Sequence, residues 1–180
     1  MKILFSLLLA FMAFDRAHAL VFIEPMLGYS TGKLETKTND NAPFKFDLAG
    51  IGFGARAGVS LGGLQLGLDH MQNNYTVKLA AANYSDKLSL SETGLFVGYR
   101  LMFFRLYGTY IFSGNDDGEG EKMKFDSGLK LGATFYALSH LAISLEMRQA
   151  QYKELIDSDG DRINAKYNTM ALVVSFPFEL

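Results

Sequence analysis

The sequence predicts an all-β fold, in which eight antiparallel up-and-down strands close into one barrel. Apolar and polar residues alternate with a period of two in eight separate segments, which is the spacing of side chains that point to opposite faces of a strand. The connections between these segments alternate between short turns and longer polar stretches. This is typical of strands that pair consecutively as hairpins, and an even number of strands lets the sheet close.

The first segment, residues 21–30, shows the pattern most simply. Val21, Ile23, Leu27 and Tyr29 share one face, and Glu24 lies on the other with Met26, Gly28 and Ser30. The following segments repeat this two-faced arrangement: residues 50–61, 64–69, 92–100, 103–112, 128–135, 141–148 and 169–178. Each segment therefore predicts one strand with an apolar and a polar face.

The fifth segment, "FFRLYGTYIF", alternates less regularly than the others. We expect Arg105 and Tyr107 to face the polar side together with Thr109, and Leu106, Tyr110 and Phe112 to face the apolar side. Its register is the least determined of the eight.

The connections fall into two classes of length. Short turns are expected at 62–63, 101–103 and 137–140, and longer polar segments at 33–43, 73–86, 114–124 and 154–165. In an up-and-down barrel all the short turns lie at one end, and all the long connections at the other. We expect both termini at the short-turn end.

The N-terminus has the features of a secretory signal peptide. Lys2 precedes an apolar run that is too short to span a membrane as a helix, and Ala17-His18-Ala19 resembles a cleavage site. We therefore expect residues 1–19 to be removed and residues 20–180 to form one barrel domain. The chain has no cysteine, so an exported form of it has no disulfide. Its formal net charge of −2 argues against nucleic acid as a partner.

The composition of the polar face decides whether that face points outward or inward. It combines many glycines with charges of both signs: Glu24, Arg56, Asp69, Glu92, Arg100, Arg105, Lys130, Glu146 and Arg148. Glycine weakens a strand on a solvent-exposed face, but in a narrow lumen it leaves room for long paired side chains. The pattern thus favours a transmembrane barrel, with the polar face inside and the apolar face toward lipid.

Aromatic residues near the strand ends support the same orientation, because aromatic side chains favour the two interfaces of a membrane. We expect one girdle at the short-turn end and one at the long-loop end. The first would comprise Phe22, Phe103, Phe104, Tyr136, Phe176 and Phe178, and the second Tyr29, Phe44, Phe46, Tyr110, Phe112, Tyr152 and Tyr167.

The signal peptide and the stretches "IEPMLGY", "GLFVGYR" and "ALVVSFPFEL" resemble the small eight-stranded outer membrane β-barrels that include the OmpA transmembrane domain, OmpX and OmpW. The resemblance implies export to the outer membrane of a Gram-negative-type bacterium. It also implies contact with outer membrane lipids and lipopolysaccharide, insertion by the barrel assembly machinery, and a monomer. Phe176, Phe178 and Leu180 would belong to a C-terminal sorting strand, although that signal usually ends in Phe.

The nine charged residues of the polar face are interpreted as a structural ion-pair network, because eight strands enclose a lumen only just wide enough for side chains. Glu24, Glu92 and Glu146 could also be considered as general acids, but buried charges are ordinarily paired. We expect no cofactor, no metal and no catalytic residue.

A lipid-modifying enzyme is the rival among enzymes, since some similar barrels carry Ser and His at an acyl-transfer site. His70, with Asp69 and Ser85 or Ser89, is the candidate near the outer rim, and no catalytic motif accompanies it. His140 and Ser139 are neighbours on a short turn, which rarely suits a nucleophile and its base.

Two acidic stretches fall in the long connections. "DSDGD" at 157–161 departs from the calcium loop of an EF-hand, because its Gly160 is fourth rather than sixth. We interpret it, and "GNDDGEGEKMK" at 114–124, as solvated loops that could contact cations between lipopolysaccharide molecules. We expect a non-enzymatic role in envelope integrity or surface interaction, with porin-like or OmpW-like transport of small hydrophobic molecules and lipid modification as alternatives.

Overall fold

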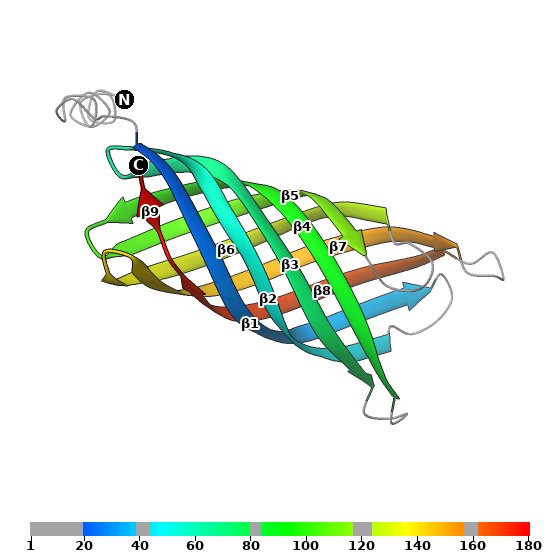
Figure 1. Cartoon of the computed structure of the whole chain (residues 1–180). Coiled ribbons are helices and arrows are strands. Elements are labelled where there is room, and N and C mark those ends of the chain that lie inside the picture. The colour runs from blue at the N-terminus through cyan, green and yellow to red at the C-terminus, as the bar shows by residue number, and fades with distance from the viewer. Residues whose placement is uncertain (1–19, 39–43, 80–83, 117–123, 157–161) are drawn as a thin grey trace, which may run out of the picture.

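The computed structural model describes residues 20–38, 44–79, 84–116, 124–156 and 162–180. Nine strands appear in this described part of the chain: β1 Leu20–Thr38, β2 Phe44–Leu61, β3 Leu64–Leu79, β4 Tyr84–Leu101, β5 Phe104–Asp116, β6 Lys124–Leu138, β7 Leu141–Ile156, β8 Arg162–Ser175 and β9 Phe178–Glu179. Consecutive strands pair antiparallel from β1 to β8, and β1 also pairs with β8 and β9. The predicted closed barrel is confirmed (Figure 1).

β8 and β9 together form the eighth strand of the barrel wall. Met26 lies opposite Ser175 and Ile23 lies opposite Phe178, so the same register on β1 continues across Phe176 and Pro177. The interruption follows from two prolines, Pro25 on β1 and Pro177, because proline has no N–H to give to the ladder. Eight strands therefore close the wall.

The short turns join β2 to β3, β4 to β5 and β6 to β7, as predicted. Gly62 and Gly63 have φ angles of 55° and 88°, which L-residues with a side chain rarely adopt and which a two-residue hairpin turn requires. Met102 takes a φ of 48° in the next turn. Both described ends of the chain lie at this end of the barrel (Figure 1).

The strands extend well beyond their predicted limits at the long-loop end. β1 continues to Thr38, and β3 continues to Leu79, through stretches that we predicted as loops. The reason is that the polarity of the two faces reverses there. Leu34 and Leu48 are buried inside, whereas Lys33 and Asp47 beside them are exposed outside. This half of the barrel has the apolar interior and polar exterior of a barrel in water.

The part of the outer wall nearer the short-turn end carries exposed apolar side chains on every strand that forms it. Leu27 is 56% exposed, Ile51 57%, Leu131 55% and Leu172 57%, so a continuous apolar belt surrounds the barrel. Among the described residues no helix is long and apolar enough to cross a membrane.

The aromatic girdles are correct only in part. The predicted members that are exposed on the outer wall are Phe103, Phe104, Phe176 and Phe178 at the short-turn end, and Tyr29, Phe44, Tyr110 and Phe112 toward the other end. The prediction was wrong for Phe22, Tyr136, Tyr152 and Tyr167, which are buried in the lumen, and Phe46 is half-buried against an interior cluster. Each lies at an inward position of its strand, so strand parity outweighs the preference of aromatic rings for the interface.

Candidate functional site

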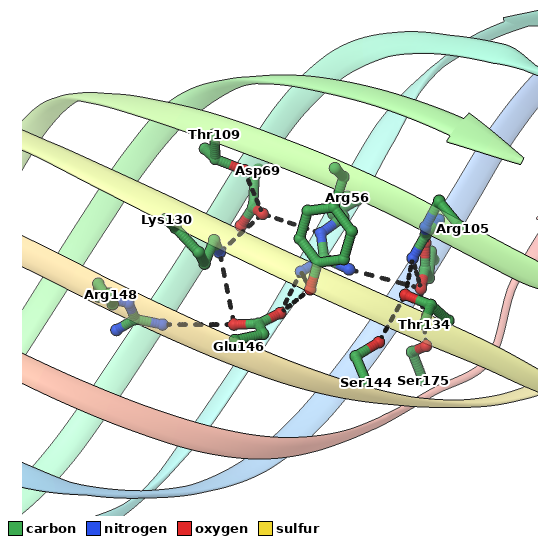
Figure 2. Close-up of polar contacts among 12 residues, drawn as sticks. Arg56, Asp69, Arg105, Thr109, Lys130, Thr134, Ser144, Glu146, Arg148 and Ser175 are labelled. Atoms are coloured by element: carbon green, nitrogen blue, oxygen red, sulfur yellow. Dashed lines mark hydrogen bonds and ion pairs between the residues drawn. The ribbon is translucent and has the colours of Figure 1, made fainter.

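Among the described residues, the lumen contains eight buried charged side chains, none more than 4% exposed: Glu24, Arg56, Asp69, Glu92, Arg105, Lys130, Glu146 and Arg148. We call this set the lumen network. β1 to β6 contribute one member each and β7 contributes two, so the set runs around most of the wall. Figure 2 labels six of its members: Arg56, Asp69, Arg105, Lys130, Glu146 and Arg148. Four are acids and four are bases, and the network is therefore formally neutral.

Arg56 lies at the centre of the lumen network. Its Nε donates to Asp69 Oδ2 at 2.8 Å, and its guanidinium also donates to Glu146 and, at 3.1 Å, to the Tyr107 hydroxyl. Tyr107 in turn donates to Glu146 Oε1 at 2.5 Å, while its ring centroid lies 4.4 Å from the Arg56 guanidinium carbon. A single arginine thus joins β2 to β3, β5 and β7.

Glu24 and Arg105 form the second centre. Arg105 donates from Nη1 and Nη2 to the two carboxylate oxygens of Glu24 at 2.6 and 2.7 Å, which is the strong two-bond geometry of this pair. Ser175 donates to the same carboxylate at 2.6 Å, and Thr134 accepts from Arg105 at 3.2 Å. β1, β5, β6 and β8 are held together here.

Lys130 and Arg148 complete the lumen network toward the long-loop end. Lys130 Nζ lies 2.7 Å from Asp69 Oδ2 and 3.9 Å from Glu146 Oε2. Arg148 lies 3.2 Å from Glu92 Oε2 and 3.8 Å from Glu146 Oε2. Every acid of the network therefore has a base within 4 Å, as buried charges require.

Buried apolar residues lie in the lumen between the lumen network and the long-loop end. They form one buried cluster at the long-loop end: Leu34, Leu48, Tyr75, Val77, Leu90, Ala150, Tyr152, Ala165 and Tyr167. We call this set the apolar cap. A smaller aromatic group, Phe22, Phe96 and Tyr107, packs against Arg56 and Arg105 below it. Buried side chains thus line the lumen from the aromatic group to the apolar cap.

The structure places eight of the nine predicted charges in the lumen network. Arg100 does not join them. Its Nη1 lies 2.8 Å from Glu179 Oε1 at the short-turn rim, where the two side chains are 28% and 34% exposed, and its guanidinium lies 4.2 Å from the ring of Tyr136. Arg100 is only one residue from the end of β4, beside the short turn to β5, which accounts for its place at the rim.

Sequence reasoning missed the neutral partners of the lumen network. Gln65, Thr109, Thr134, Ser144 and Ser175 are buried inside and bond to its charged members or to each other. The inward parity of Gln65, Thr109, Thr134 and Ser144 was readable, because each shares a face with a predicted charge on its strand. Ser175 lies opposite Met26 and Ala142, which are buried inside as well. The predicted sorting residues Phe176, Phe178 and Leu180 are all exposed on the outer wall.

The acid and the histidine of the lipid-modifying alternative do not converge. Asp69 points into the lumen, but His70 follows it on the strand and points outward, where Nδ1 lies 2.9 Å from Thr93 Oγ1. Ser89 donates to Asn74 rather than to a histidine. His140 lies 3.3 Å from the carbonyl of Pro177 and stacks on Phe178. The "DSDGD" stretch and residues 117–123 of the acidic loop lie outside the described residues.

No protein-family model matches the chain, and no curated protein matches it either. Two solved structures of Ail, the attachment invasion locus protein of Yersinia pestis, are similar, each with a TM-score of 0.54. The one in complex with the heparin analogue sucrose octasulfate is 13% identical and covers 88% of this chain and 99% of its own. The other is 14% identical and covers 87% and 98%.

The outer membrane protein OprG from Pseudomonas aeruginosa is also similar, with a TM-score of 0.45 and 10% identity over 90% of this chain and 98% of its own. At these identities the likeness to Ail concerns the fold. The resemblance to small eight-stranded outer membrane β-barrels, predicted from the sequence, is thereby confirmed for the architecture.

Proposed function

We propose that this chain, which has the fold of the small outer membrane β-barrels, is an integral outer membrane protein that works through its outer surface and not through its lumen or as an enzyme. Residues 1–19 direct its export, and the long-loop end faces the outside of the cell. Its role is in envelope integrity or in surface interaction through the loops.

The observation that carries this proposal is the set of paired charges in the lumen. Every acid of the lumen network lies within 4 Å of a base, and the apolar cap lies between the network and the long-loop end. A solute would have to displace these buried, paired charges, which is costly. The interior therefore serves stability, and contact with other molecules falls to the outside.

The outer wall at the long-loop end offers a surface for such contact. Eight lysines point outward there, on seven of the strands: Lys33, Lys37, Lys45, Lys78, Lys87, Lys124, Lys153 and Lys166. Only Lys45 and Lys153 form ion pairs with described residues, at 3.2 Å to Glu35 and 2.7 Å to Asp126. We call all eight lysines together the lysine collar. It stands next to the apolar belt, where the phosphates of lipopolysaccharide would lie, and its charge suits them.

The test compares a deletion strain complemented with wild type or with a Lys33→Gln/Lys78→Gln/Lys87→Gln variant. The expected result is that wild type restores resistance to EDTA and detergent, and that the variant is inserted and heat-modifiable but restores less. Restoration equal to wild type would contradict a role for the collar.

Three further measurements examine the alternatives. Planar bilayers with purified protein should show no conductance, small-molecule uptake should be unchanged by the deletion, and lipid mass spectra should be identical with and without the protein. Conductance or altered uptake would favour transport, and altered lipids would favour a lipid-modifying enzyme.

A further inference from the structure

One part of the outer wall departs from the apolar belt. On β3 and β4, six polar side chains, none of them an acid, a lysine or an arginine, point outward in three cross-strand pairs, which we call the polar ladder: His70 with Thr93, Gln72 with Ser91, and Asn74 with Ser89. β3 and β4 lie side by side over this stretch (Figure 1). The outward residues nearer the short turn, such as Leu66, Leu68 and Leu95, are apolar as elsewhere.

The polar ladder begins at a height where neighbouring strands still present apolar side chains. Gln72 lies opposite Phe53 of β2, and Asn74 lies opposite Ile51, both about half exposed. On the other side Leu95 of β4 lies opposite Tyr110 of β5, and the bulge after Thr93 brings Ser113 beside the ladder. Leu27, Phe53, Gln72 and Ser91 are successive cross-strand partners on β1, β2, β3 and β4. The outward side chains in this row are therefore apolar on β1 and β2 and polar on β3 and β4.

The ladder satisfies its own hydrogen bonds only at its two ends. His70 bonds to Thr93 at 2.9 Å, and Ser89 donates to Asn74 at 3.0 Å. Gln72 and Ser91, in the middle, make no side-chain hydrogen bond to another described residue. An amide without a partner at the edge of hydrocarbon is unfavourable, because no water is there to replace the missing bonds.

We propose that the polar ladder is the contact surface for a second copy of this chain, related by a two-fold axis that passes near Gln72 and Ser91. This proposal rests on the membrane location proposed above, and it departs from the monomer that the sequence led us to expect.

The chemistry of the ladder is complementary to itself. Amide and hydroxyl groups donate and accept alike, so two copies of Gln72, Asn74 and Ser91 can bond to each other without a different partner surface. A two-fold contact requires this property, since the same patch serves both sides. Ser, Thr, Asn, Gln and His are also the side chains that join membrane segments through hydrogen bonds.

A hollow beside the ladder adds a second complementary feature. It has a volume of about 330 Å³ and is lined by Tyr29, Asp47, Leu48, Ala49, Gly50, Thr76 and Lys78. Asp47 and Lys78 are opposite each other on β2 and β3, both are exposed, and neither forms an ion pair with a described residue. Across a two-fold axis, Asp47 of each copy can approach Lys78 of the other, which gives two equivalent pairs.

The absence of cysteine in the sequence makes disulfide cross-linking a direct test. Gln72→Cys is compared with Gln149→Cys, a matched control because Gln149 is also a glutamine that points outward and lies on β7. Membranes that contain each variant are oxidised and run unboiled and boiled without reductant. We expect a dimer band several-fold stronger for position 72 than for position 149.

Equal cross-linking at both positions, or none at position 72, would overturn the proposal. In either case a heat-modifiable band in the outer membrane fraction would leave the proposed location intact, so the two proposals can fail separately.

A second measurement addresses variants of the surface itself. Native mass spectrometry of wild type in mild detergent should give the dimer, and Gln72→Leu/Ser91→Leu should give folded monomer. Gln149→Leu should remain dimeric. If wild type is monomeric and instead releases a bound glycolipid that the double variant lacks, the ladder is a lipid site and the dimer is overturned.

Discussion

Arg105 holds Glu24 through two parallel hydrogen bonds of 2.6 and 2.7 Å, across the lumen from β5 to β1. Both side chains are fully shielded from solvent. The two residues are 81 positions apart in the sequence. Their pairing therefore fixes how the first and the fifth strand face each other, and it can form only when the barrel has closed.

Replacing Glu24 with Leu should destabilise the barrel by about 3–5 kcal/mol, because Arg105 would be left as a buried charge that has lost its main partner. Unfolding by urea in lipid vesicles measures the loss. Glu35→Leu is the control, since Glu35 pairs with Lys45 on the exposed surface and should cost less than about 1 kcal/mol. Equal losses for the two variants would contradict the structural role of the lumen network.

A double-mutant cycle separates the pair from its surroundings. Glu24→Leu/Arg105→Leu should lose less than the sum of the two single variants, because neither charge then remains buried without its partner. Strict additivity would mean that the two side chains do not interact in the folded protein.

The residues of this network were predictable from the sequence, whereas their pairing was not. Alternation with a period of two assigned Glu24, Arg56 and Asp69 to the inner face, because any other parity would expose the apolar set on the same strands to the lumen. The choice of Arg105 as the partner of Glu24 depends on the stagger of the whole barrel. That quantity is set by all eight strand pairings together and leaves no local signal.

The Arg100 to Glu179 ion pair should behave differently from the lumen network. Both side chains are about a third exposed, so Glu179→Gln should change the free energy of unfolding by at most about 1 kcal/mol. The difference should shrink in about 1 M salt, where the screening length falls to about 3 Å. The destabilisation by Glu24→Leu should persist in the same salt. If the loss of stability in Glu179→Gln did not depend on salt, the Arg100 to Glu179 pair would behave like the buried pairs of the lumen network.

Glycine in the lumen provides the next prediction. An added Cβ at Gly132 on β6 would overlap the ring and hydroxyl of Tyr107, which is fixed by its bonds to Arg56 and Glu146. Gly132→Ala should therefore cost about 1–3 kcal/mol, as overpacking of a filled interior does. Gly108→Ala on β5 is the control, because its Cβ would meet no atom closer than 3.5 Å. If both variants unfold at the wild-type urea concentration, the lumen is less tightly filled than described.

The errors in the aromatic girdles have one cause. Phe22 lies between Val21 and Ile23 and shares the parity of Glu24, but its residue type suggested the membrane interface. Tyr136 was assigned in the same way. Residue type reports a preference of the side chain, while parity reports geometry that a closed sheet cannot change. The period is therefore the more reliable signal in such chains.

The reversal of polarity along the barrel leads to the last prediction. Leu48 and Ile51 lie three residues apart on β2, but Leu48 is 1% exposed inside the apolar cap and Ile51 is 57% exposed on the outer wall. Leu48→Ala should cost about 2–5 kcal/mol, because it removes packed methyl groups and leaves a cavity. Ile51→Ala should cost much less, since lipid or detergent can fill the space that its side chain leaves. Urea unfolding of the two variants in the same vesicles measures the difference. A larger loss for Ile51→Ala would mean that the core of the long-loop half does not lie inside the barrel.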